Sequence, residues 1–152
     1  MIAEALLSIV TMSYTIEVSV VSFHPEVSTI VEKGVWSNAN GGTWTEDQGK
    51  QILRIGGSGT SGALRIKNTA GNQFFAVVGV HNYELWVDVL TDIKDNDTVV
   101  VLLPQYHGGG KRSGISLVQM VQKSDAAGRY IYLRKEGQSP DGKTFYCSII
   151  IT

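Results

Sequence analysis

The stretch Phe74-Phe75-Ala76-Val77-Val78-Gly79-Val80 says most about the fold class of this chain. Every residue in it is apolar or glycine, and β-branched and aromatic side chains, which favour strands, dominate. The run is far shorter than the roughly 18 apolar residues that indicate a membrane-spanning helix. A short, continuous apolar run of this kind is typical of a strand whose two faces are both covered. The sequence therefore predicts a β-rich protein with this strand in its interior.

Strand patterns continue on both sides of this run. Tyr14, Ile16, Val18 and Val20 alternate with polar residues, which predicts a half-buried strand. The turns between the strands carry Gly, Asn and Asp, the residues that tight turns favour. We expect a single sandwich of mostly antiparallel sheets with a helical connection. Further strands are predicted at 27–36, 51–55, 64–67, 117–121, 130–134 and 145–151.

The hydrophobic period changes after residue 82. Tyr83, Trp86, Val87 and Leu90 recur at i, i+3, i+4 and i+7, which predicts a short amphipathic helix with Asn82 as its N-cap. Further on, 95–97 is a candidate cap for a second helix. The following run, 99–103, would serve equally well as a strand, and we favour a helical turn there.

Composition excludes several classes of protein. The chain has 152 residues, 43% hydrophobic and 18% charged, which fits one globular domain with a hydrophobic core. A net charge of -1 offers no basic field to hold nucleic acid. The single Cys147 excludes an intrachain disulfide and a Cys-based zinc site, and its alternating run predicts a buried thiol. Since the three histidines are widely spaced, we expect no metal and no cofactor.

The first eleven residues read differently from the rest. Residues 1–10 lack a basic start and carry Glu4, which makes them a poor secretory signal, so we expect a cytoplasmic protein. A second methionine, Met12, directly precedes the first convincing strand. We therefore expect residues 1–11 to be an extension outside the fold and residues 12–152 to form the domain.

Three glycine-rich stretches point to function: Asn40-Gly41-Gly42-Thr43-Trp44, Gly56-Gly57-Ser58-Gly59-Thr60-Ser61-Gly62 and Gly79-Val80-His81-Asn82-Tyr83. Each joins or follows a strand-like run and places backbone amides beside hydroxyl, amide or imidazole groups. Glycine lets a backbone turn sharply and approach a ligand closely, because it has no Cβ. Such loops can match the hydroxyls of a sugar one by one, so we expect a sugar-binding site rather than a catalytic one.

Two enzymatic interpretations of these stretches fail on their residues. A Walker loop needs Lys and then Ser or Thr after its last glycine, whereas Ala63 and Leu64 follow Gly62. A nucleophile elbow needs Gly-x-Ser-x-Gly, and neither Ser58 nor Ser61 has both glycines. No sequence motif indicates a catalytic triad of a serine with His81 and Asp88.

The three stretches, followed by Trp86 and Asp88, resemble the fungal fruit-body lectin family in order, spacing and residue type. The resemblance runs from Met12 to the C-terminus. It implies a mainly β, actinoporin-like sandwich of two sheets joined by a helix–loop–helix. It also implies a lectin without metal that forms homodimers or homotetramers and binds Galβ1-3GalNAc (the T antigen) or GalNAc-type glycans, with a separate GlcNAc site.

The resemblance carries two sets of candidate residues. The galactosamine site falls on Ala39, Ser58, Gly59, His81 and Asn82, all of which match the family pattern. The second, GlcNAc site falls on Asp88, Val89, Thr91 and Arg112. Met120 or a near neighbour stands where the family places a tyrosine, so we expect GlcNAc to bind weakly or not at all.

The leading interpretation is thus a non-enzymatic lectin. A different class, a membrane-active pore former on the related fold, is the alternative, because Ile2, Leu6, Leu7, Ile9 and Val10 can form a small amphipathic helix. That helix would be short and lacks a basic face, so the membrane-active interpretation is the weaker of the two. A hydrolase is the third interpretation.

Overall fold

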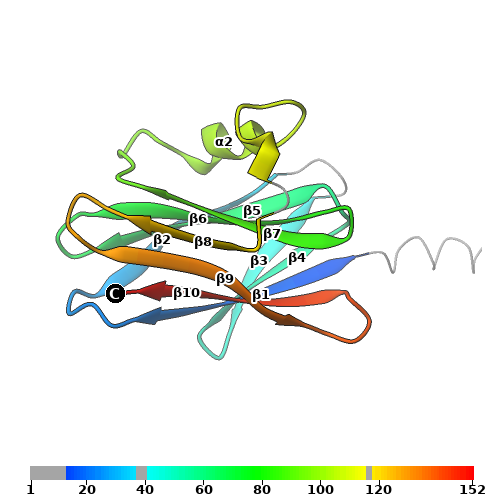
Figure 1. The fold of residues 1–152 in the computed structure, drawn as a ribbon, viewed down its shortest axis with the longest axis horizontal. Helices are drawn as coiled ribbons and strands as arrows, with labels where there is room; N and C mark the ends of the chain where they lie inside the picture. The colour runs from blue at the N-terminus through cyan, green and yellow to red at the C-terminus, as the bar shows by residue number, and fades with distance from the viewer. Residues whose placement is uncertain (1–12, 37–40, 116–117) are drawn as a thin grey trace, which may run out of the picture.

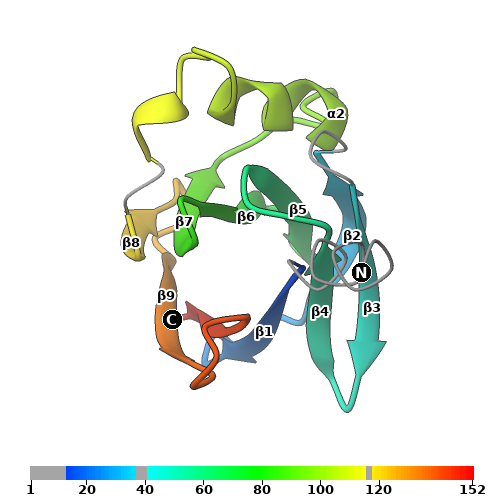
Figure 2. The ribbon, with the colours of Figure 1, turned by 90° about the vertical axis from the view of Figure 1, so that its right-hand side faces the viewer.

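The computed structural model describes residues 13–36, 41–115 and 118–152. Two β-sheets pack face to face, and a connection with short helical turns lies over the outer face of one of them (Figures 1 and 2). The mainly β, actinoporin-like sandwich expected from the sequence is confirmed. Three expectations concern residues outside the described ones: the extension 1–11, its amphipathic helix, and Ala39.

The larger sheet has six strands in the order β3-β4-β1-β10-β9-β8. Strands β1 and β10 run parallel in its centre, and the other neighbours are antiparallel. The predicted alternation of Tyr14, Ile16 and Val18 places these three side chains in the core. The strand bounds are β1 Tyr14–Ser22, β3 Gly42–Asp47, β4 Lys50–Ile55, β8 Met120–Ser124, β9 Tyr130–Gln138 and β10 Thr144–Ile151.

The smaller sheet has four antiparallel strands in the order β2-β5-β6-β7. Its residues 74–80 on β6 are buried on both faces, as the sequence predicted. One face meets the larger sheet, and the other is covered by the helical connection. The strand bounds are β2 Ser28–Val35, β5 Thr60–Asn68, β6 Gln73–His81 and β7 Glu84–Thr91.

The connection between β7 and β8 contains α2 (Val99–Leu102) and the 3-10 turns η1 (Leu103–Tyr106) and η2 (Ser113–Ile115). The helical turn expected at 99–103 is therefore confirmed. Its cap differs from the expected one: Thr98 is the N-cap residue, and its side chain makes no capping bond. The carboxylate of Glu32 on β2 accepts the Val99 N–H instead, at 3.1 Å, which fixes the helix to the sheet.

The amphipathic helix predicted from Tyr83 to Leu90, with Asn82 as its N-cap, is wrong. Residues 84–91 form strand β7, which pairs with β6 along its whole length. Leu85 to Val89 are all buried, because the strand is covered on both faces. A run that is buried on both faces can fit a helical period by coincidence. Asn82 and Tyr83 have φ of 49° and 67°, and they form the two-residue turn of a β-hairpin rather than a helix start.

Two smaller boundaries also differ from the sequence prediction. The glycine-rich stretch 40–44 predicts a loop, yet 42–47 forms the edge strand β3. The Trp44 Nε1–H donates to the carbonyl of Gly34 at 2.9 Å, which ties this edge strand to β2 of the other sheet. The strand predicted at 117–121 begins later, at Met120.

Candidate functional site

The β5–β6 hairpin brings two of the three glycine-rich stretches to the same end of the sandwich. Thr60 pairs with Val80, and the Gly59 N–H donates to the Val80 carbonyl at 2.6 Å. The Tyr83 N–H donates to Ser58 Oγ at 3.3 Å. Both candidates on the first loop, Ser58 and Gly59, therefore lie beside the β6–β7 turn.

The third stretch joins the same end through the edge of the larger sheet. The Gly56 N–H donates to the carbonyl of Gly41 at 3.0 Å, and Gly42 pairs with Ile55. Ala39, the remaining candidate of the galactosamine site, lies outside the described residues. The described chain resumes two residues after it, at Gly41, within reach of the loop that carries Ser58.

The groups offered at this end suit hydroxyl recognition. His81 and Asn82 are exposed, and Ser58 and Gly59 are half-buried. Because Ser58 Oγ accepts from the Tyr83 N–H, its own proton is left to donate. Gly59 has φ of 91°, and no atom lies within 4 Å of the position its Cβ would take. A ligand can therefore approach this backbone closely.

A second histidine lies beside the site, and no sequence motif points to it. His107 follows η1, and its Nε2 lies 2.7 Å from Ser61 Oγ. Its ring stacks on Trp36, with 4.9 Å between ring centroids. Burial, followed by the nearby His81, lowers the pKa of His107, so this ring is neutral at pH 7. Ser61 and His107 are 46 residues apart, and only the path of the helical connection brings them together.

The candidates for the second sugar site do not share one exposed surface. Asp88 is 4% exposed, and its Oδ2 accepts a hydrogen bond from the Tyr106 hydroxyl at 2.6 Å. The Val89 side chain is fully buried between the sheets. The Thr91 hydroxyl donates to the Ser124 carbonyl at 3.2 Å. Asp88 and Val89 are thus engaged in the fold rather than presented to solvent.

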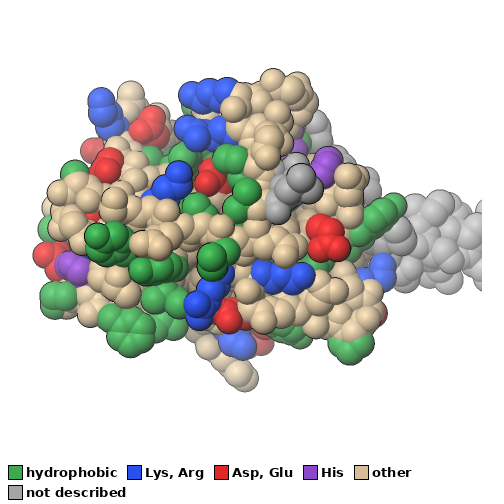
Figure 3. All heavy atoms as spheres, in the orientation of Figure 1, with side chains coloured by type: hydrophobic (Ala, Val, Ile, Leu, Met, Phe, Trp, Pro, Cys, Tyr) green, Lys and Arg blue, Asp and Glu red, His purple; other side chains and the backbone are tan. Residues whose placement is uncertain are grey.

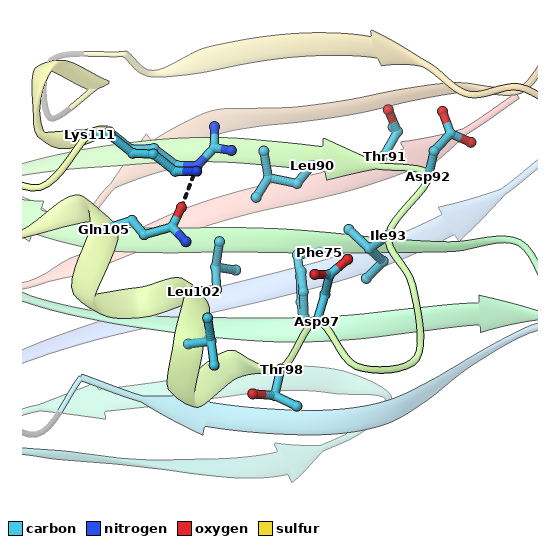
Figure 4. A pocket seen from close by; sticks show the side chains of 12 residues that line it. Phe75, Leu90, Thr91, Asp92, Ile93, Asp97, Thr98, Leu102, Gln105 and Lys111 are labelled. Atoms are coloured by element: carbon cyan, nitrogen blue, oxygen red, sulfur yellow. Dashed lines mark hydrogen bonds between the residues drawn. The ribbon is translucent and has the colours of Figure 1, made fainter.

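Thr91 and Arg112 both line a hollow of about 230 Å³ between β7 and the helical connection (Figure 4). Arg112 Nε donates to Gln105 Oε1 at 3.0 Å on one wall of this hollow. Met120, which the sequence leads us to expect at or near the place of the family's tyrosine, is 67% exposed on β8 and is not part of the lining. The lining also includes Leu90, Asp92, Asp97 and Lys111.

Other kinds of site find little support in the part of the chain that the structure describes. No group of three or more His, Cys, Asp or Glu residues there has the arrangement of a metal site. Cys147 is buried, as predicted, and burial raises the pKa of its thiol to about 12. Asp88, the acid of the triad considered above, pairs with a tyrosine rather than with an imidazole.

Surface charge and helix length bear on binding to nucleic acid and to membranes. Figure 3 shows Lys and Arg side chains interspersed with Asp and Glu on one face, so no basic field covers that face. Among the described residues, no helix is both long enough and apolar enough to cross a membrane.

Comparison with known proteins was made by sequence and by structure. The sequence pattern of the family described as "Fungal fruit body lectin" matches residues 12–136. Boletus edulis lectin, from Boletus edulis, is 45% identical over 104 residues, which cover 67% of this chain and 73% of that protein. The crystal structure of wild-type Xerocomus chrysenteron lectin superposes with a TM-score of 0.87 at 36% identity, covering 93% of this chain and 100% of that one.

A more distant likeness is found to the lipid binding protein Nakanori, with a TM-score of 0.52 and 12% identity over 91% of this chain and 71% of that one. At that identity the likeness shows a shared fold and nothing about ligands.

Proposed function

We infer that this chain, which belongs to the fungal fruit body lectin family, binds glycans bearing Galβ1-3GalNAc or GalNAc at the end of the sandwich that carries Ser58, Gly59, His81 and Asn82. As a lectin it binds carbohydrate without transforming it, which agrees with the non-enzymatic interpretation of the sequence. The family fixes the class of ligand, and the particular sugar is the proposal.

One observation carries this proposal: the contact between Ser58 Oγ and the Tyr83 N–H, together with the pairing of Thr60 and Val80. These contacts place an exposed imidazole and an exposed carboxamide next to a serine hydroxyl and an open glycine. Each group can donate, accept or do both, and a hexose hydroxyl needs a partner of each kind.

Discrimination between sugars follows from the cost of an unpaired hydroxyl. A buried polar group without a partner costs about 1–3 kcal/mol, so a hydroxyl of the wrong configuration weakens binding strongly. The Asn82 carboxamide offers an acceptor and two donors on an exposed turn. It is thus suited to the axial O4 hydroxyl that distinguishes galactose from glucose configuration.

Titration calorimetry with Galβ1-3GalNAc tests this assignment. His81→Ala and Ser58→Ala should each lower the affinity at least about tenfold, equivalent to about 1.4 kcal/mol, with the circular dichroism spectrum unchanged. His24→Ala is the matched control, because His24 follows the end of β1 at Ser22, whereas the start of that strand pairs with Ile55, next to the glycine-rich loop of the site. Parent-like affinity in both site variants would place the sugar elsewhere.

The second site is proposed to be weak. Asp88 is held by Tyr106 and the Val89 side chain faces the core, so only Thr91 and Arg112 of the four candidates line the hollow. Met120, which is expected at or near the place of the family's tyrosine, does not line it. We further propose that the protein assembles as a dimer or tetramer, as the family resemblance implies, and sedimentation velocity measures that state.

A further inference from the structure

Two hairpins of this protein use the same turn with different residues. In the β3–β4 hairpin, Gln48 and Gly49 have φ of 50° and 78°. In the β6–β7 hairpin, Asn82 and Tyr83 have φ of 49° and 67°. Both are two-residue turns with two left-handed residues, the type I′ geometry that matches the twist of a hairpin.

The two turns differ in the residue type at their second position. Glycine is the favoured residue there because a Cβ crowds the following carbonyl in the left-handed region. The β3–β4 turn has Gly49 at that position, whereas the β6–β7 turn has Tyr83. Among the described residues, Tyr83 is the only aromatic residue with positive φ.

Burial does not compensate Tyr83 for this conformation, since its side chain is 64% exposed. The conformation of Tyr83 therefore strains the backbone, and the packing of its side chain offsets little of that strain. Strained residues that persist at an exposed position concentrate at functional sites. An exposed tyrosine in a strained conformation therefore suggests that its ring contacts a ligand.

The position of Tyr83 indicates what that ligand is. Its own N–H is bonded to Ser58 Oγ, and Asn82 precedes it, so the residue stands at the edge of the proposed sugar site. This main-chain bond ties the β6–β7 turn to the loop that carries Ser58.

We propose that Tyr83 is a specificity-determining residue of this site, presenting its aromatic face to the apolar face of a galactose-configured ring. The inference rests on the proposed function. In galactose the axial O4 lies on one side of the ring, and the C–H groups at C3, C4 and C5 gather on the other side. An aromatic ring against that side buries apolar surface and leaves the hydroxyls to their hydrogen-bonding partners. Tyrosine suits the role because it loses little side-chain freedom on binding.

The proposal makes stability and affinity change in opposite directions. Tyr83→Gly removes both the strain and the ring, so it should raise the melting temperature while weakening Galβ1-3GalNAc binding about fivefold or more. Tyr83→Asn, with a residue that tolerates the left-handed region, should behave in the same way. Tyr83→Phe keeps the ring and should bind within about twofold of the parent.

The β3–β4 turn supplies the matched control. Gly49→Tyr places the same side chain in the same backbone conformation, where no atom lies within 4 Å of a new Cβ. It should lower the melting temperature by about as much as Tyr83→Gly raises it, and it should leave the sugar affinity unchanged. This swap separates the strain of a left-handed tyrosine from its role in binding.

The experiment is thermal unfolding of all four variants together with calorimetric titration of Galβ1-3GalNAc. Higher stability with weaker binding in Tyr83→Gly and Tyr83→Asn supports the proposal. Parent-like affinity in these two variants overturns it, and so does a fivefold loss in Tyr83→Phe. If His81→Ala still weakens binding when the Tyr83 variants do not, only the role of Tyr83 fails. A parent protein that does not bind the disaccharide instead overturns the proposed function itself.

Discussion

Replacing Gly79 with alanine tests the packing on the outer face of the smaller sheet. Gly79 lies in β6 directly opposite Trp86 of β7. A Cβ built at residue 79 would lie 2.5 Å from Cε2 and Cζ2 of the indole and 2.7 Å from its Nε1. Trp86 cannot move aside freely, because it is 2% exposed and stacks on Tyr106 with 5.1 Å between ring centroids.

Two opposing effects set the size of the change. Alanine in place of a strand glycine stabilises by about 0.5–1 kcal/mol through the lost freedom of the unfolded chain. Overpacking against a locked indole costs about 1–3 kcal/mol, and such close contacts place this case in the upper part of that range. We therefore expect Gly79→Ala to lower the free energy of unfolding by about 1–2 kcal/mol. For a chain of this length that corresponds to a fall in Tm of about 2–8 °C.

Urea unfolding followed by tryptophan fluorescence measures this change as a lower midpoint at an unchanged m-value. Gly137→Ala on β9 is the control, because no atom lies within 4 Å of its new Cβ. It should stabilise the protein by about 0.5–1 kcal/mol. If Gly79→Ala stabilises the protein as Gly137→Ala does, the packing of the indole over Gly79 is wrong.

Three further predictions concern other parts of the chain. Because the folded-state pKa of His107 lies below its ordinary value of 6.5, its contribution to stability is complete above about pH 6.5 and is lost as the pH falls through the folded-state pKa. The urea unfolding midpoint should therefore fall between pH 7.5 and pH 5, and it should fall less steeply in His107→Gln than in the parent. Equal slopes in the two proteins would contradict this prediction. GlcNAc and chitobiose should bind more weakly than Galβ1-3GalNAc in calorimetric titration. Equal affinities would mean that the GlcNAc site does not lack an aromatic residue near Met120. A chain starting at Met12 should keep the parent's melting temperature and sugar affinity, and a large loss of either would show that residues 1–11 belong to the fold.

The sequence predicted best those elements whose surroundings differ on their two faces. Strand β1 alternates because only one of its faces meets the core, and the alternation of Tyr14, Ile16 and Val18 is visible without any structure. The meeting of Ser58 with the β6–β7 turn was also predictable, because an antiparallel hairpin returns its chain to the end where it began.

The sequence was a poor guide where burial on both faces removed the alternation of a strand, and where contacts join residues far apart in the chain. Strand β7 is buried on both faces, and its apolar residues fit a helical spacing equally well. Its turn carries Asn82 and Tyr83 in place of the Asn-Gly pair that predicts such a turn. The contact of His107 with Ser61 depends on where the helical connection crosses the sheet, and no local pattern records that path. The engagement of Asp88 by Tyr106 has the same origin.

The most direct test of the sugar site is a titration of ¹⁵N-labelled protein with Galβ1-3GalNAc, followed by amide chemical shifts. The account predicts that the largest shift changes fall on residues 57–59 and 81–83, the two segments joined by the bond between the Tyr83 N–H and Ser58 Oγ. Smaller changes should reach Ser61 and His107 beneath them. Largest changes around Thr91 and Arg112, or no change at saturating disaccharide, would contradict the claim that this end of the sandwich binds galactosamine-type glycans.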